Sequence, residues 1–108
     1  MRVVFHVDES GKVGMTLANV ANLLEDEPDA AVAVVVNSAA VMDLARGSEY
    51  AEEIGALAAE GVEVVACGNS LGKADIGSGE LLDPVETVPS GVGMIARRQA
   101  DGWHYIRP

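Results

Sequence analysis

The strongest constraint on the fold is an unbroken apolar run from Ala30 to Val36. A strand with one face in solvent alternates apolar and polar residues, whereas a strand that is covered on both faces is apolar throughout. Parallel sheets with helices on both faces are the usual setting for such strands. The run therefore predicts a central strand in an α/β protein.

Shorter segments on either side of this run fit the same architecture. Strands are predicted over Arg2–Val7, Ala30–Val36, Val62–Ala66, Glu86–Pro89 and Trp103–Ile106. Helical spacing of apolar residues predicts helices over Val13–Glu25, over Ala39–Ala45, through Glu53 and Leu57 to Gly61, and over Gly91–Ala100. The pattern predicts an α/β fold with about five mostly parallel strands and helices on both faces, which gives three layers.

The length and the hydropathy pattern limit the organisation of the chain. With 108 residues there is room for one core, so we expect a single domain over residues 1–108. No apolar run approaches the roughly 18 residues that a membrane span requires. The segment Met1–Asp8 becomes acidic too early for a signal peptide. We therefore expect a cytoplasmic protein with no membrane partner.

The charge balance narrows the choice of partners. Seven basic and 17 acidic residues give a net charge of −10, which repels nucleic acids and anionic membrane surfaces. We expect no nucleic-acid partner. With Lys12 and Lys73 as the only lysines, the chain resembles halophilic cytosolic proteins. An ordinary acidic protein is the alternative.

The single cysteine, Cys67, is the most informative residue for function. It follows the predicted strand Val62–Ala66 and begins a glycine-rich loop that ends at Gly72. The carboxyl ends of parallel strands form the functional edge of such a sheet, and loop amides there stabilise a thiolate. We expect solvent to reach this thiol, which makes Cys67 the candidate nucleophile. In the alternative interpretation, Cys67 is a small buried hydrophobic residue that ends the strand.

Residues near the same edge are candidates for binding. Gly68, Asn69 and Ser70 follow the cysteine directly, and Asn37 and Ser38 follow the central strand. Asn37 and Ser38 are also well suited to cap the helix that is predicted after them. A lone cysteine offers neither a disulfide nor a cysteine cluster, so we expect a reducing compartment and no metal.

Other motifs carry weaker signals. The segment Asp8–Lys12 contains a Gly-Lys pair but lacks the other residues of a phosphate-binding loop, so it predicts a plain turn. His6 and His104 lie inside predicted strands and are interpreted as hydrogen-bonded structural or interface residues. No hydrolase elbow or dinucleotide fingerprint is present, and we expect no cofactor.

The last helix contains two further features of interest. The segment Gly91–Gly93 opens this helix, where close packing or capping is favoured over binding of an anion. Arg97 and Arg98 lie further along it. In so acidic a chain, we expect these two arginines to pair with carboxylates of a neighbouring subunit rather than to bind a separate acidic partner.

Two longer segments carry a family resemblance. The segment Val64–Leu71, VVACGNSL, and the segment Val88–Pro108 together resemble the DsrE/DsrF-like family. The resemblance implies a small α/β protein that forms a homotrimer or hexamer and is related to sulfur-relay proteins, in which a cysteine carries a persulfide. Cys67 matches the position of that cysteine. The dedicated relay proteins are hetero-oligomers with longer loops, whereas this chain is short and most resembles members whose activity is not established.

These observations lead to two hypotheses. In the first, the protein is a sulfurtransferase-like carrier: Cys67 accepts sulfur as a persulfide from a donor protein and passes it to an acceptor thiol. In the second, the protein is a non-catalytic oligomeric binding or scaffold protein in which Cys67 is inert. The accessibility of the thiol distinguishes them.

Overall fold

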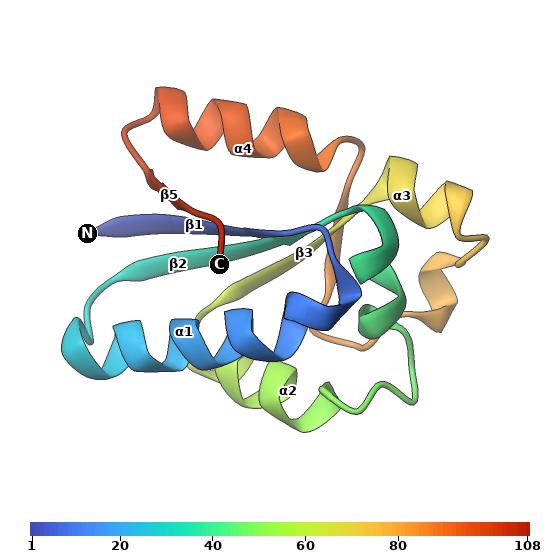
Figure 1. The fold of residues 1–108 in the computed structure, drawn as a ribbon, viewed down its shortest axis with the longest axis horizontal. Helices are drawn as coiled ribbons and strands as arrows, with labels where there is room; N and C mark the ends of the chain where they lie inside the picture. The colour runs from blue at the N-terminus through green and yellow to red at the C-terminus, as the bar shows by residue number, and fades with distance from the viewer.

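Five parallel strands form the sheet at the centre of the molecule (Figure 1). The computed structural model describes residues 1–108. The strands are β1 (Arg2–Val7), β2 (Ala31–Val36), β3 (Glu63–Cys67), β4 (Glu86–Val88) and β5 (His104–Ile106). They lie in the order β4-β3-β2-β1-β5, and every neighbouring pair is parallel. The predicted α/β class is confirmed, with β2 at the centre.

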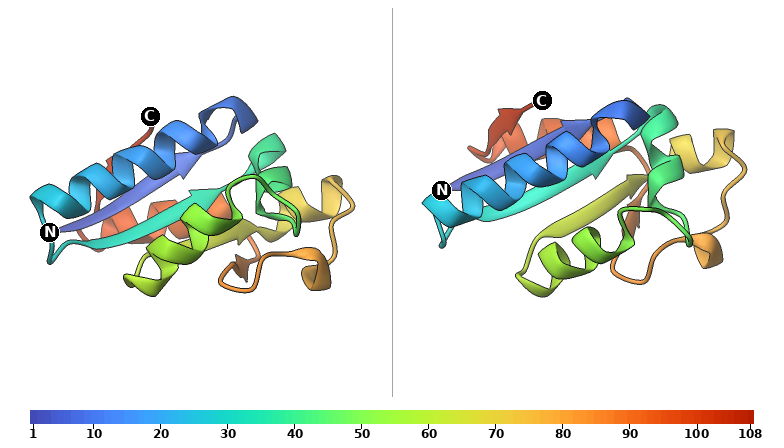
Figure 2. Two further views of the ribbon diagram at one scale, coloured as in Figure 1. Left: turned by 90° about the horizontal axis from the view of Figure 1, so that it is seen from below. Right: turned by 60° about the horizontal axis from the view of Figure 1, so that its bottom comes forward.

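Helices cover both faces of the sheet. The α-helices are α1 (Val13–Asp26), α2 (Ala51–Ala59), α3 (Gly68–Lys73) and α4 (Gly91–Ala100), and the 3₁₀ helices are η1 (Ser10–Lys12), η2 (Ser38–Leu44) and η3 (Ser78–Glu80). Figures 1 and 2 show α1 and α2 on one face and α4 alone on the other. The three predicted layers are therefore present.

The two faces of the sheet differ in the size of their cores. Successive side chains of β2 point to opposite faces, so Val34 and Val36 join one core while Ala33 and Val35 join the other. The core under α1 and α2 contains 19 buried residues, whereas the core under α4 contains six. One helix thus covers the whole second face.

Side-chain contacts hold α4 to this face. Arg98 binds the carboxylate of Glu63 on β3, with Nη1 2.8 Å from Oε2, and its guanidinium lies 4.4 Å from the ring centroid of Trp103. Arg98 was expected to pair with a carboxylate of a neighbouring subunit, but it pairs with Glu63 of its own chain. A half-buried ion pair that is also stacked on an aromatic ring fixes the last turns of α4 against the sheet.

Two predicted local structures differ from the observed ones. The segment after Cys67, predicted as a loop, forms the short helix α3, because burial of Leu71 outweighs the low helix propensity of the glycines around it. The helix predicted over Ala39–Ala45 is the 3₁₀ helix η2. Asn37 precedes η2, but its side chain forms no capping hydrogen bond.

The two edges of the sheet are short strands. β4 and β5 contain three residues each, and all three residues of β5 are exposed. Tyr105 and Ile106 on β5 each expose 40% of their surface. No helix in the chain combines the length and the hydrophobicity needed to cross a bilayer.

Candidate functional site

Cys67 is the last residue of β3, at the carboxyl edge of the sheet. Val36 on β2 pairs with Ala66 on β3, so Asn37 and Cys67 lie one residue further along the two strands. In the isolated chain Cys67 exposes only 6% of its surface. The expectation of an openly accessible thiol is wrong for this conformation, because the chain returns over the sulfur at the start of α4.

Gly91, the first residue of α4, packs directly against the cysteine. A Cβ atom placed at Gly91 would lie 3.1 Å from Cβ of Cys67 and 3.2 Å from Cγ1 of Val35. Both distances are shorter than ordinary van der Waals contact, so a Cβ here would push its neighbours away by a few tenths of an ångström, whereas glycine lets α4 begin this close to the sheet. Gly91 therefore serves close packing, as predicted, and the contact places the first turn of α4 on the thiol.

The segment before α4 also packs closely on α3. A Cβ atom at Gly68 would lie 3.0 Å from the carbonyl oxygen of Val88. The backbone N–H of Asn69 donates to the carbonyl of Pro89 at 3.3 Å. These contacts fix the amino-terminal ends of α3 and α4 on two sides of Cys67.

Ser38 is linked to the thiol site through Ser70. Ser38 has a φ of 53°, a left-handed conformation that is uncommon for residues other than glycine. In this conformation its backbone N–H donates to Oγ of Ser70 at 2.8 Å. The Ser70 oxygen is therefore an acceptor for Ser38, and its own proton remains available for another acceptor.

Two opposing effects determine the acidity of the thiol. Burial raises the pKa of Cys67, because the thiolate loses hydration. Hydrogen bonds from the Ser70 hydroxyl and from the backbone N–H groups of Gly91, Ser70 and Asn69 lower it. The donors outweigh burial, so the pKa of Cys67 lies below its ordinary value of 9.0. The thiol is buried but surrounded by groups that favour its ionised form.

A pocket opens beside Ser70. It has a volume of about 360 Å³ and is lined by Ser38, Ala39, Met42, Ser70, Lys73 and Ala74. A larger hollow of about 450 Å³ lies between α1 and α2, where Pro28 and the carboxylates of Glu25 and Glu60 line it. That hollow contains no nucleophile. The smaller pocket shares Ser70 with the cysteine site and is therefore the one of chemical interest.

Comparisons with known proteins agree with this geometry. A sequence model described as the DsrE/DsrF-like family matches residues 1–108. The chain belongs to the DsrE/DsrF-like family. No curated protein matches the chain.

Two solved structures show how closely this DsrE/DsrF-like chain follows known ones. A protein of unknown function, MTH1491 from Methanobacterium thermoautotrophicum, is 42% identical, with a TM-score of 0.94 over 99% of this chain and 98% of that one. The ychN protein from E. coli is 19% identical, with a TM-score of 0.82 over 99% of this chain and 97% of that one. The second likeness concerns the fold alone.

The structure brings most of the predicted site residues of this DsrE/DsrF-like chain together. Gly68, Asn69 and Ser70 form the first turn of α3 beside Cys67, and Ser38 joins them through the Ser70 hydroxyl. The side chain of Asn37 instead turns toward β1. Its Oδ1 lies 2.9 Å from Nε2 of His6.

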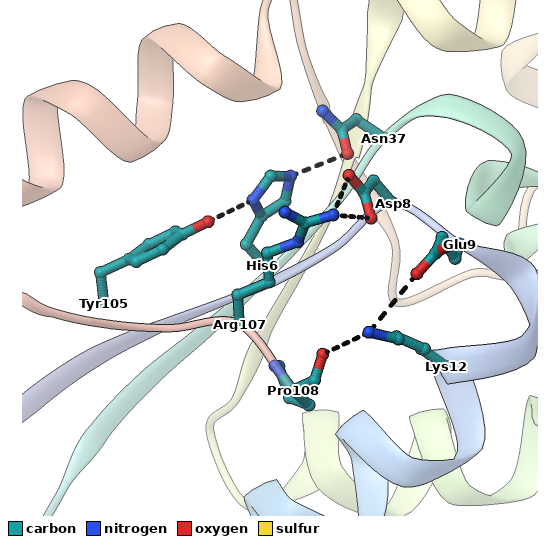
Figure 3. A network of polar contacts seen from close by, with 8 residues as sticks. All are labelled: His6, Asp8, Glu9, Lys12, Asn37, Tyr105, Arg107 and Pro108. Carbon is teal, nitrogen blue, oxygen red and sulfur yellow. Dashed lines mark hydrogen bonds and ion pairs between the residues drawn. The ribbon is translucent and has the colours of Figure 1, made fainter.

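The sequence pattern did not reveal the residues that contact Asn37. Nδ1 of His6 lies 2.7 Å from the Tyr105 hydroxyl, so a hydrogen-bonded row joins Tyr105, His6 and Asn37 (Figure 3). His6 was expected to be a hydrogen-bonded structural residue, and these two bonds fit that expectation. Its position near the cysteine depends on which strands are neighbours in the sheet, which local patterns do not reveal.

The remaining candidates lie outside the cysteine site. The segment Asp8–Lys12 contains the 3₁₀ helix η1, and its charged ends are used in contacts with the end of the chain: Arg107 binds Asp8 at 2.9 Å and Lys12 donates to the carbonyl of Pro108 at 3.1 Å (Figure 3). His104 is exposed on β5. No group of three or more metal-binding side chains lies together in the structure.

Proposed function

We propose that this protein is a persulfide carrier in which Cys67 receives and releases a sulfur atom. The observation that carries the proposal is the set of hydrogen-bond donors on Ser70, Asn69 and Gly91, which lower the pKa of a buried thiol. A structural cysteine in an apolar strand end has the opposite environment, in which burial raises the pKa. The family is associated with sulfur relay in general, which supports the same chemistry.

The loading step is a displacement at sulfur. The Cys67 thiolate attacks the outer sulfur of a donor persulfide, R–S–SH, and forms a new S–S bond. The S–S bond of the donor breaks, and its electron pair leaves on the donor sulfur as a thiolate. One neutral sulfur atom moves and one thiolate replaces another, so the step needs no oxidant or reductant.

The release step is the same reaction in the other direction. An acceptor thiolate attacks the outer sulfur of the Cys67 persulfide, and Cys67 leaves as a thiolate. A thiol of lower pKa is a better leaving group, so the donors around Cys67 favour release as well as ionisation. The pocket lined by Ser38, Ser70 and Lys73 shares Ser70 with the cysteine site and would hold the donor or acceptor molecule next to it.

We also infer that the carrier works as a homo-oligomer in the cytoplasm. Met42 and Val92 expose 62% and 63% of their surface, and the edge strand β5 exposes Tyr105 and Ile106. Association of copies would cover apolar groups of this kind. Light scattering should report a trimer or a hexamer, at least three times the chain mass of 11.2 kDa. A monomer at micromolar concentration contradicts this inference.

Persulfide trapping tests the sulfur-carrier proposal. The protein is incubated without oxygen with sodium tetrasulfide, freed of excess reagent, alkylated and weighed intact by mass spectrometry. We expect one added sulfur atom on the wild type, its loss on addition of a thiol acceptor, and none on Cys67→Ser. Protein trapped in its native cell should carry the same modification. A wild type that takes up no sulfur under either condition favours the scaffold hypothesis.

A further inference from the structure

A row of polar side chains crosses the α4 face of the sheet at its carboxyl end. Val35, two residues before Asn37, lies in the core under α4, and so does Val4, two residues before His6. Because side chains alternate along a strand, His6 faces α4, and Asn37 follows the same face at the end of β2. Tyr105 pairs with Val4 and joins the row from β5. Cys67, Asn37, His6 and Tyr105 therefore follow the strand order from β3 to β5.

Asn37 is the link between this row and the thiol. It exposes 9% of its surface, and its Cβ lies 3.6 Å from the position of a Cβ at Gly91, the same point that lies 3.1 Å from Cβ of Cys67. The start of α4 thus rests on Asn37 and Cys67 together. Since Val36 pairs with Ala66, Asn37 and Cys67 are also neighbours across β2 and β3.

Half of the Asn37 amide has no partner. Its Oδ1 is occupied by His6, whereas its amide nitrogen has no hydrogen-bond acceptor in the chain. Figure 3 shows this nitrogen pointing away from the imidazole. No completely enclosed side-chain nitrogen or oxygen lacks a partner, so the amide nitrogen borders space that a small group can enter. The amide nitrogen is therefore a donor that no group of the chain uses, in a residue that is otherwise largely buried.

We propose that the Asn37 amide is a hydrogen-bond donor to Cys67, both to the thiolate and to the outer sulfur of its persulfide, and that His6 and Tyr105 are positioning residues that hold the amide in place. This role rests on the proposed function, since the outer sulfur of a persulfide supplies an acceptor beyond the thiol itself. The donors on Ser70 and Gly91 face the cysteine sulfur. The Asn37 amide adds a further hydrogen-bond donor from the side of β2.

The hydrogen bonds of the row fix the direction of the amide. A neutral imidazole has one donor and one acceptor nitrogen. When the Tyr105 hydroxyl donates to Nδ1, Nε2–H of His6 donates to Oδ1 of Asn37, and the –NH₂ group is left for the sulfur. The charged groups on the surrounding elements are Asp8, which Arg107 binds, Glu86 on β4, Lys73 on α3, Arg97 on α4, and the pair that Arg98 on α4 forms with Glu63 on β3. None of these is in the row.

The test is the rate of iodoacetamide alkylation of Cys67 against pH, measured on the folded, sulfur-free protein by intact mass spectrometry. Asn37→Ala should move the midpoint about one pH unit upward, which makes alkylation about tenfold slower below both midpoints. Should Asn37→Ala fail to fold, Asn37→Asp keeps an acceptor for His6 and should move the midpoint in the same direction. A folded Asn37 variant with the wild-type midpoint overturns the proposal.

Variants of the positioning residues separate this role from a purely structural one. His6→Ala should slow alkylation about threefold at the same pH, and His6→Gln, which retains a donor for Asn37, should restore most of the rate. Tyr105→Phe should have a smaller effect in the same direction. The matched control is His104→Ala, which removes the other histidine and should leave the profile unchanged. Equal profiles for His6→Ala and His104→Ala contradict the role of His6.

The closing experiment also separates this inference from the proposed function. Tetrasulfide loading is measured on the same variants. If the wild type takes up no sulfur while Asn37→Ala shifts the midpoint, the carrier function fails and Asn37 is a donor to the thiolate alone. If the wild type and the Asn37 variants load and release sulfur at equal rates and share one midpoint, the carrier function stands and the role of Asn37 fails.

Discussion

The two faces of the sheet are built for different purposes. Under α1 and α2, a core of 19 buried residues joins strands, helices and the 3₁₀ helix η2. Under α4, only six buried residues form the core, and polar groups occupy the carboxyl end of the same face. Cys67, Asn37 and His6 all belong to this thinner layer.

The two faces therefore have different roles: one stabilises the fold and the other carries the reactive groups. A large apolar core contributes most of the hydrophobic stabilisation, which grows with the apolar area removed from water. A layer of one helix is easier to displace, and a buried thiol becomes accessible when the covering element moves locally. We infer that the α1 and α2 face holds the fold while movement at the start of α4 admits reactants to Cys67.

The largest expected effect comes from truncating the two cores in parallel. Ile54→Ala, in the large core, should lower the free energy of unfolding by about 4 kcal/mol, and Ile95→Ala, under α4, by about 2 kcal/mol, because the thin layer relaxes more easily around the cavity. Urea denaturation measures both. Only Ile95→Ala should also speed alkylation of Cys67 in the folded protein. Faster alkylation in Ile54→Ala alone contradicts the division between the faces.

A pair of glycine variants sharpens the same comparison. Gly91→Ala forces a methyl group against Cys67 and Val35 and should destabilise the protein by about 2 kcal/mol while changing the alkylation rate. Gly55→Ala is the matched control in α2. A Cβ there meets nothing within 4 Å, so the change should stabilise the helix by about 0.5 to 1 kcal/mol. Thermal unfolding should show a lower melting temperature for Gly91→Ala and a higher one for Gly55→Ala.

The sequence was sufficient to predict most of this architecture. The apolar run of β2 identified the centre of a parallel sheet, and the segment Gly91–Ala100 was predicted to be the helix that is observed as α4. The apolar run Val62–Ala66 likewise predicted that Cys67 lies at the carboxyl end of a strand. Each of these predictions depends on local periodicity and on the alternation of strands with helices.

The polar row could not be predicted in this way. β5 returns to lie beside β1 at the far edge of the sheet, 99 residues away from His6 at the Tyr105 contact. No local pattern encodes that pairing, so the hydrogen bonds of His6 emerge only from the topology. The burial of Cys67 was given only as the alternative interpretation, because Gly91, which covers it, comes from a distant segment.

The smallest effect is on the pH dependence of stability. Because the folded pKa of Cys67 lies below 9.0, the thiolate stabilises the folded state, and this contribution is complete above about 9.0 and lost as the pH falls through the folded pKa. The free energy of unfolding of the wild type relative to Cys67→Ser should therefore rise with pH in this window. Denaturant titrations at several pH values measure the difference. A relative stability that falls over the same window contradicts a lowered pKa.

The most direct test of the account is the alkylation profile of Cys67 itself. Because the chain has one cysteine, the rate of iodoacetamide addition in the folded protein reports on this thiol alone, with Cys67→Ser as the blank. We predict a midpoint below that of the same chain unfolded in denaturant, together with a rate limited by the burial of the sulfur. A folded midpoint at or above the unfolded one, or a thiol that reacts only after global unfolding, contradicts the central claim that the fold prepares Cys67 as a thiolate.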